Sequence, residues 1–577
     1  MVKKIFALLG KEVAGLHEAA YLLALATVIS LVLALVRDKL LAYFFGAGHI
    51  LDLYYASFRI SDIIYATIAS TVAASVLVPF LIKKNKAAGA AGGPGDADGR
   101  KGSAEERHFI DHTFSIFFLV IVGVSAVIFF FIPWLIPKLL PGFAHDPSLP
   151  MLITTSRIML LSPILLGISN FFASVTQMYN RFLIYAVSPL LYNLGIIIGI
   201  LFLYPHFGLY GLVGGVVLGA VMHMLLQIPF VASRGLMPRF VFPIDWREVR
   251  EVVLVSFPRT ITLSANEIAE FFLIAFATLM GAGAVSIFNF SFNLQSVPLA
   301  IIGVSYSSAA FPTLAKLFGS GDIKRYVDYM ATSARHIIFW AMPVTVLFIV
   351  LRAQIVRTIL GAGQFSWADT RLTAAMLALF TISVAGQSLI LLFVRAYYAE
   401  GKTRRPLLVN VISAAAIVLF AYFFKILFTS YPDFAFFIES LFKISDLNGA
   451  IILTLSLAYS IGVLLNTYLH WQMFHRDYGG WKGGFTKPVL KTFFHSFGAS
   501  VIGGYAAFWG LHLFAQVFNL QKIIGIFLQG FFSGILGIIV WILVLILIRN
   551  SELAEVWKAL HSKIFKAKPV AVDQEIL

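Results

Sequence analysis

The chain contains no cysteine, and only 12% of its 577 residues are charged. The missing cysteine excludes a disulfide framework and thiol chemistry. The low charge excludes an ordinary soluble domain, in which roughly 25% of residues are charged. A Walker loop, a nucleophile elbow and an HExxH zinc pattern are also absent, and the histidines are scattered. We therefore expect no enzyme active site, no metal site and no cofactor.

The chain is instead rich in apolar residues. Hydrophobic residues make up 59% of the chain, and the mean hydropathy is +0.89. Runs of roughly 20 apolar residues, enough for a helix to cross a hydrocarbon core of about 30 Å, recur from end to end. They predict an all-α integral membrane protein with about 14 transmembrane helices. The expected spans are residues 18–43, 50–82, 109–137, 149–178, 182–204, 208–231, 249–280, 284–316, 330–351, 370–399, 404–428, 448–474, 492–517 and 523–548.

Basic residues gather in every second loop between these spans. By the positive-inside rule this alternation predicts that both termini are cytoplasmic. The net charge of +15 is then explained by topology and by attraction to anionic lipid, so we expect membrane lipids and no nucleic acid as partners. The basic loops contain Lys83, Lys84, Lys86, Arg100, Lys101 and Arg107; Arg234, Arg239, Arg247 and Arg250; Lys316, Lys324 and Arg325; Lys402, Arg404 and Arg405; and Arg476, Lys482 and Lys487.

Two segments outside the spans have distinct compositions. Residues 84–107, rich in Gly, Ala and charge, cannot bury a core and are expected to form a flexible cytoplasmic loop. The C-terminal SELAEVWKALHSKIFKAK, residues 551–568, places apolar residues on one helical face and lysines around it. This pattern predicts a helix on the inner leaflet, with a partner-binding site as the alternative.

Short motifs repeat six spans apart. PLLYN at 189–193 returns as PLLVN at 406–410, and PFLIK at 79–83 resembles PTLAK at 312–316. A repeat of six spans keeps both copies in the same orientation, as in transporters built from two parallel lobes. We expect an N-terminal lobe at 1–245, a C-terminal lobe at 246–478, and two extra helices with a basic amphipathic tail at 479–577.

The stretch LVRDKLLAYFFGAGHILDLYYASF, residues 35–58, places Arg37, Asp38 and Asp52 within apolar sequence. An ionisable side chain near a bilayer centre costs at least about 2.5 kcal/mol and usually has a function. With FGAG at 45–48, the stretch resembles the first two helices of the MurJ (MviN) lipid II flippases of the MOP exporter superfamily. Further resemblance lies in Phe58, Val78, Pro79, Asn180, Arg181, Phe182, Ala186, Pro189, Asn193, Pro258, Ala277, Gly281, Pro298, Pro312, Tyr398, Ala399, Gly401, Thr403 and Pro406.

This resemblance covers nearly the whole chain and implies a MOP/MATE-like fold in the bacterial inner membrane. It also implies a function, in which an undecaprenyl-pyrophosphate-linked peptidoglycan precursor moves from the inner to the outer leaflet by alternating access. Cell-wall synthesis enzymes are candidate partners. The polyprenyl tail is expected to remain in lipid, in a groove of the two extra helices.

Arg37 is the residue we expect to bind the pyrophosphate, because a guanidinium pairs with phosphate oxygens and stays charged at any depth. The alternative is a structural ion pair with Asp38 or Asp52. Arg59 shares a helical face with Asp52 and Asp62, so it either binds substrate or neutralises Asp62. The candidate substrate-binding residues are Arg37, Asp52, Arg59, Arg259 and Asn293.

Polar stripes also mark spans seven and eight. Arg259, Thr262, Asn266 and Glu270 share one face of span seven, and Asn289, Asn293 and Ser296 one face of span eight, so a polar wall is expected there. Glu267 and Glu270 are candidates for coupling to a cation or proton. The alternative is that they form satisfied interhelical hydrogen bonds.

The chain departs from its family resemblance at several positions. Leu31, Tyr65 and Asn293 stand where further cavity arginines are expected, and Leu273 stands where an ion-binding carboxylate is expected. Arg59 and Arg259 are candidate replacements. These departures keep two alternatives open. The first is another MOP exporter, moving a different lipid-linked oligosaccharide or an amphipathic drug, and the second is a transport-inactive cell-wall scaffold.

Overall fold

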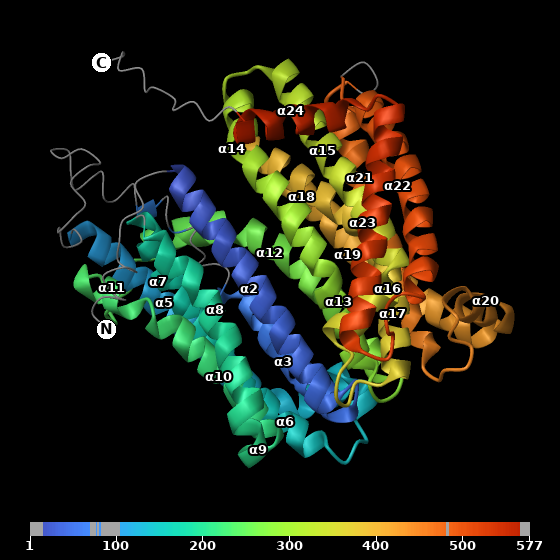
Figure 1. The fold of residues 1–577 in the computed structure, drawn as a ribbon. Helices are drawn as coiled ribbons and strands as arrows, with labels where there is room; N and C mark the ends of the chain where they lie inside the picture. The colour runs from blue at the N-terminus through green and yellow to red at the C-terminus, as the bar shows by residue number, and fades with distance from the viewer. Residues whose placement is uncertain are drawn as a thin grey trace. The chain divides into compact units, whose positions relative to one another are not determined.

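The computed structural model describes residues 16–69, 77, 80, 81, 104–179, 181–479 and 484–565, and every regular element in these ranges is a helix (Figure 1). The prediction of an all-α protein is confirmed. Most of the loop at 84–107, the motif Val78-Pro79 and the end of the basic tail lie outside the described residues. The helices belong to two compact units that interleave along the chain. The lobe boundaries at 245 and 478 stay predictions.

The first unit comprises the described parts of Met1–Asn293, Ile359–Met376 and Thr403–Gly462. Its helices include those that contain Arg37, Asp38, Asp52 and Arg59. The helices are α2 (Leu16–Phe45), α3 (His49–Thr67), α5 (Ala104–Leu139), α6 (Leu149–Met159), α7 (Leu161–Met178), α8 (Phe182–Ile198), α9 (Tyr204–Phe207), α10 (Leu209–Leu225), α11 (Ile228–Ser233), α12 (Trp246–Thr278), α13 (Ala284–Pro298), α17 (Trp367–Thr381), α19 (Arg404–Ser430) and α20 (Pro432–Phe442), with the short turns η2 (Pro141–Phe143), η3 (Gly199–Leu203) and η5 (Ala450–Ile452).

The second unit comprises Leu294–Thr358, Leu377–Lys402 and the described part of Val463–Leu577. It begins inside α13 and takes the end of α17 and most of α21. Its further elements are η4 (Leu299–Val304), α14 (Ser305–Gly319), α15 (Ile323–Val350), α16 (Arg352–Ile359), α18 (Val384–Ala399), α21 (Leu453–Asp477), α22 (Thr486–Ala515), α23 (Ile523–Leu547) and α24 (Ser551–Phe565).

Ten segments among the described residues are long and apolar enough to cross a membrane, and α17 with α18 makes eleven if this bent pair is one span. Three more predicted spans correspond to α2, α3 and α12. The first and last have 30 and 33 residues, about 45 and 50 Å at about 1.5 Å per residue. The 19-residue α3 carries Asp52, Arg59 and Asp62, which lowers its apolar character. The total of 14 stays a prediction.

Small residues set the closest helix packing in the first unit, between α8 and α10 (Figure 1). A Cβ atom at Gly195 of α8 would overlap the backbone of Gly219, and one at Gly199, the first residue of η3, would overlap that of Gly215. In the reverse direction, a Cβ atom at Gly215 would overlap Gly199 and one at Gly219 would overlap the backbone of Tyr192. Glycines four residues apart let two helix backbones approach closely, the usual device in membranes. Dispersion contacts between the close backbones stabilise this pair, because hydrophobic burial contributes little between helices in a membrane.

Aromatic side chains form the core of the second unit. Tyr326, Phe393, Phe474 and Phe485 are almost fully buried, with ring centroids of neighbours 4.8 to 6.3 Å apart. Such offset and edge contacts favour one arrangement of α15, α18 and α21.

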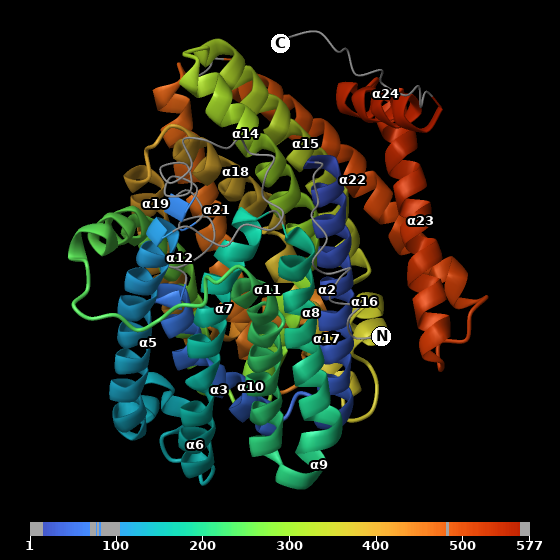
Figure 2. The ribbon, with the colours of Figure 1, turned by 90° about the vertical axis from the view of Figure 1, so that its left-hand side faces the viewer.

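The end of the chain packs back onto this unit. Figure 2 shows α24 turned across the end of α23. Leu553 and Val556 of α24 pack against a cluster that contains Phe339 and Trp541, whereas Trp557 is 71% exposed. The predicted amphipathic helix is present as α24. Part of its apolar face is used inside the protein, so only the remainder is available to the leaflet.

Candidate functional site

Arg37 lies near the end of α2 within a buried polar cluster of the first unit. Its Nε and Nη2 atoms donate to Oδ1 of Asp38 at 2.9 and 2.7 Å, and Nη1 donates to Asn193 of α8 at 3.1 Å. Asn293 of α13 donates to the other carboxylate oxygen of Asp38, at 3.1 Å. Three helices therefore meet at one ion pair, in which the Asp38 side chain is almost fully buried and that of Arg37 is 20% exposed.

Asp52 does not pair with Arg37. Its Oδ2 atom accepts from the backbone N–H of Gly283 at 2.5 Å, and its Oδ1 atom accepts from the backbone N–H and hydroxyl of Ser286 at 2.8 and 2.6 Å. These donors lie at the N-terminus of α13, where backbone N–H groups lack partners in the helix and the helix dipole favours an anion. The carboxylate of α3 thus caps α13, and its role toward substrate stays a prediction.

Glycine makes this junction possible. Gly283 has a positive φ of 87°, and a Cβ atom there would overlap the carbonyl oxygen of Ala47. Gly46 has a φ of 60°, and a Cβ atom there would press on the backbone of Gln364. Both positions require left-handed backbone and close approach, which glycine provides without strain.

Arg59 forms a second buried ion pair, between α3 and α12. Its Nη1 atom lies 3.0 Å from Oε1 of Glu270, Nη2 donates to Asn289 of α13 at 3.2 Å, and Nε donates to the carbonyl of Tyr55. Asp62, the partner considered from the sequence, is farther from Nη2, at 3.6 Å. Glu270 therefore belongs to an interhelical pair, the arrangement that the alternative interpretation of this residue expected.

The polar stripes of spans seven and eight are placed only in part. Asn289 and Asn293 contact Arg59 and Asp38, so the stripe on α13 does face α2 and α3. Glu267 is half-buried on α12, one turn before Glu270. The side chains of Arg259, Thr262 and Asn266 lie outside the described residues, although their backbones belong to α12.

The positions where the family resemblance leads us to expect arginines hold uncharged groups. Tyr65 accepts a hydrogen bond from Asn170 at 3.1 Å, Leu31 is half-buried, and Asn293 holds Asp38. The sequence analysis did not identify Ser286 as part of the site. The one available signal was its place just after the Gly-Ala-Gly turn at 281–283, where a helix begins and its N–H groups seek an acceptor. Within the described residues, no group of three His, Asp or Glu side chains could hold a metal ion.

Comparisons with known proteins agree with this geometry. The family model described as lipid II flippase MurJ matches residues 41–529. A probable lipid II flippase MurJ of Buchnera aphidicola is 24% identical over 394 residues, 67% of this chain and 73% of the relative. The lipid II flippase MurJ of Burkholderia cenocepacia is 24% identical over 387 residues, covering 66% and 72%.

Solved structures show the fold. A lipid II flippase MurJ in an inward closed conformation superposes with a TM-score of 0.71 at 20% identity, covering 92% of this chain and 99% of that one. An inward-facing multidrug resistance MATE transporter of the MOP superfamily gives 0.60 at 12% identity, covering 79% and 98%. The MOP/MATE-like fold expected from the sequence is confirmed. Since the family model spans most of its length, the chain belongs to the MurJ lipid II flippase family.

Proposed function

We propose that this chain is a lipid II flippase, which moves the undecaprenyl-pyrophosphate-linked peptidoglycan precursor from the inner to the outer leaflet by alternating access. Beside family membership, the observation that supports this function most is the Arg37 cluster, a guanidinium held between three helices. A pyrophosphate head cannot enter hydrocarbon without partners, because each unpaired polar group is costly there. A fixed cation within the protein removes part of that penalty.

Arg37 is arranged to hold its position and still bind an anion. Three of the five N–H donors of a guanidinium are used, two by Asp38 and one by Asn193. Two donors remain for phosphate oxygens. When the phosphate draws the guanidinium toward itself, Asn293 still holds the carboxylate of Asp38. In this proposal Asn293 is a positioning residue, and Arg37 makes the direct contact.

The other candidate residues have supporting roles. Asp52 caps α13 and ties it to α3, so it aligns the helices that present the cluster. Arg59 is engaged by Glu270, Asn289 and Tyr55, and we propose that it provides the counter-charge for the acidic side of α12. Arg259 stays a candidate for direct substrate contact.

Coupling to a cation or proton is a further part of the proposal. Glu267 and Glu270 lie one turn apart on α12, and Arg59 contacts Glu270. Uptake of a proton by one carboxylate would weaken the hold on Arg59 and hence the α3–α12 contact. A Glu267→Gln variant should then transport with a changed pH dependence, whereas unchanged dependence would remove Glu267 from this role.

The chain is a multi-pass membrane protein, and we propose that it resides in the bacterial inner membrane with both termini cytoplasmic. The clustering of basic residues in alternate loops supports this orientation. The orientation can be tested by cysteine labelling, because the chain has no cysteine of its own. Single cysteines replace Lys324 and Gln521, which are expected on opposite sides of the membrane, and are labelled with an impermeant reagent. If reagent added on one side of the membrane labelled both cysteines to the same extent, the proposed orientation would be contradicted.

A different lipid-linked oligosaccharide is the second candidate cargo. The uncharged groups at Leu31, Tyr65 and Asn293 favour it, because they leave fewer cations for a pyrophosphate head than the family resemblance predicts. A transport-inactive scaffold that binds cell-wall synthesis enzymes is a third possibility. In our proposal such enzymes use the exported precursor, and their direct binding is a prediction.

Transport in proteoliposomes separates these candidates. Labelled lipid II is placed in the inner leaflet, and its arrival outside is followed with an impermeant reagent. We expect wild type to transport lipid II, and excess of another polyprenyl-pyrophosphate oligosaccharide to compete poorly. Strong competition would favour the second cargo. A folded protein that transports neither would favour the scaffold.

A further inference from the structure

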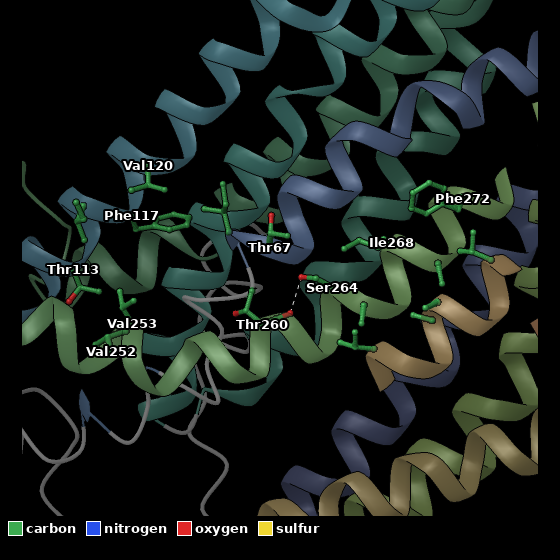
Figure 3. A pocket seen from close by; sticks show the side chains of 18 of the residues that line it. Thr67, Thr113, Phe117, Val120, Val252, Val253, Thr260, Ser264, Ile268 and Phe272 are labelled. Carbon is green, nitrogen blue, oxygen red and sulfur yellow. Dashed lines mark hydrogen bonds between the residues drawn. The ribbon is translucent and has the colours of Figure 1, made fainter. Parts of the chain in front are cut away.

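A large apolar cavity lies in the first unit, apart from the Arg37 cluster. Its volume is about 890 Å³, and no charged side chain is among the described residues that line it. Figure 3 shows Thr113, Val252 and Val253 toward one end and Phe272 toward the other. Val252 and Phe272 are twenty residues apart along α12, or about 30 Å, so the cavity is elongated. Its remaining walls come from α5, α19 and the end of α3.

Water is not a suitable occupant of this cavity. The polar lining consists of hydroxyl groups, and Thr67 and Ser264 donate theirs to carbonyls of their own helices, at 2.6 and 2.8 Å. The hydroxyl of Thr113 is buried without a hydrogen-bond partner, but a buried water needs two to four polar partners, and one such hydroxyl does not provide them. The cavity is open along its rim, so it is filled from the surroundings of the unit, and its apolar wall favours apolar contents. The cavity therefore calls for a hydrocarbon.

The rim of the cavity faces the surroundings of the unit. Val120 of α5 is 42% exposed, Val253 of α12 51% and Leu419 of α19 67%. Both α5 and α19 are apolar enough to span a membrane, so the exposed side chains of Val120 and Leu419 are expected to face lipid. A chain of a neighbouring lipid can enter from the bilayer without crossing a polar layer.

Cations stand at the cytoplasmic ends of two lining helices. Arg250 is exposed two residues before Val252 on α12, and Arg404 is exposed seven residues before Val411 on α19, about 10 Å along the helix. Guanidinium groups at that level pair with phosphate, and a head with a net negative charge is attracted more strongly than a zwitterionic choline head, whose phosphate is offset by its own cation. Charge and shape together suit a lipid with an anionic head and a saturated or unsaturated fatty chain.

We propose that this cavity holds an acyl chain of an anionic phospholipid of the cytoplasmic leaflet, with its phosphate bound by Arg250 and Arg404. None of the described lining residues belongs to α2, α8 or α13, which build the Arg37 cluster, so the cavity is separate from that cluster. The bound lipid fills the space between α5, α12 and α19 and stabilises their packing. Only the name of the leaflet depends on the proposed orientation.

The test uses the full chain, purified in detergent and stripped of lipid. Dioleoylphosphatidylglycerol, dioleoylphosphatidylcholine and undecaprenyl phosphate are titrated separately in mixed micelles. Melting temperature and lipid retained in native mass spectrometry are the two readouts. We expect phosphatidylglycerol to raise the melting temperature most. Arg250→Gln with Arg404→Gln should weaken its apparent affinity roughly twentyfold, about fivefold for each charge.

Filling the cavity tests the acyl chain. Ala269→Phe, deep in the cavity, and Ala415→Phe, at its rim, should both reduce retention of phosphatidylglycerol and phosphatidylcholine. Ala416→Phe is the matched control on α19, outside the lining. Lys324→Gln with Arg325→Gln removes two exposed charges elsewhere and controls for net charge.

The outcomes are distinct. Equal effects of both phospholipids, unchanged by Arg250→Gln with Arg404→Gln, would overturn the anionic-head assignment. Retention unchanged by both cavity-filling variants would overturn the site itself. Preference for undecaprenyl phosphate would assign the cavity to a polyprenyl chain, as the transported lipid also carries, and overturn the phospholipid. Because the readout is binding, failure of the transport assay leaves this test unaffected.

Discussion

The Nη2 atom of Arg37 lies 2.7 Å from Oδ1 of Asp38, its neighbour along α2, and Asn193 and Asn293 complete the cluster from α8 and α13. A partly buried cation within apolar sequence is retained with a partner that keeps it ionised and in place. The pair is therefore both structural and available for an incoming phosphate, since two guanidinium donors remain.

Replacing Arg37 by lysine should separate charge from geometry. The ammonium keeps the positive charge but loses the planar fork that binds Asp38 twice. We expect Arg37→Lys to transport at a reduced rate and Arg37→Ala to be inactive, with both present in the membrane. The measurement is lipid II transport in proteoliposomes. Equal activity of wild type and Arg37→Ala would contradict the proposed role.

Asp52→Asn should weaken the α3–α13 junction. An amide turned toward Gly283 or Ser286 places a donor against a donor, and an unsatisfied buried group costs about 1–3 kcal/mol. Ser286→Ala removes only one hydroxyl bond and should cost about 0.5–1.5 kcal/mol. Thermal unfolding in detergent measures both. The same melting temperature for Asp52→Asn and wild type would argue against the cap.

The α8–α10 contact should tolerate no added methyl group at Gly219. A Cβ atom there would overlap the backbone of Tyr192, whereas at Gly214 the nearest atom is a leucine methyl at 4.0 Å. We expect Gly219→Ala to lower the melting temperature. Gly214→Ala, the control on the same helix, should leave it equal or raise it, because alanine favours helix by about 1 kcal/mol over glycine. Similar losses in both variants would contradict the packing account.

Docking of α24 should weaken in acid. Burial alone would raise the pKa of Glu552, but hydrogen bonds from Thr492 and Arg335 outweigh it and lower the pKa from about 4.5 to about 2. A depressed carboxyl pKa stabilises the folded form above 4.5, and this contribution is lost as the pH falls from 4.5 to 2. A spin label on Lys558→Cys should therefore be constrained at pH 6 and mobile near pH 2.

Glu552→Gln should free the same label at neutral pH. Glu555→Gln is the comparison, with a smaller effect expected, because Glu555 is more exposed and lies 3.6 Å from Arg335 and 3.1 Å from Nε2 of His336. A label that stays constrained in Glu552→Gln would show that Leu553 and Val556 hold α24 without the ion pair.

Sequence patterns predicted the helices well because apolar length and charge are local properties. The span expected at 109–137 is contained in α5, and the stripe of Asn289 and Asn293 does meet charged residues of α2 and α3. The extra helix α20, in the segment predicted to connect two spans, was missed. So was the break in the tenth span, where α17 and α18 meet at 42° and the Ser383 hydroxyl bonds the carbonyl of Phe380. Such side-chain competition with the helix leaves little trace in composition.

Partners across the chain could not be predicted in the same way. Asp52 was considered beside Arg37 because they are close in sequence, yet it binds Ser286, 234 residues away. Arg59 was considered beside Asp62, yet its closer carboxylate is Glu270. Which helices are neighbours is decided by tertiary packing, and periodicity on a single helix carries no information about it.

Rescue of a bacterium whose own lipid II flippase is switched off tests the central claim most directly. Wild type and Arg37→Ala are compared at equal expression in the membrane. The account predicts growth with wild type and lysis with Arg37→Ala. Lysis with both would contradict lipid II as the cargo, and growth with both would contradict the role of Arg37.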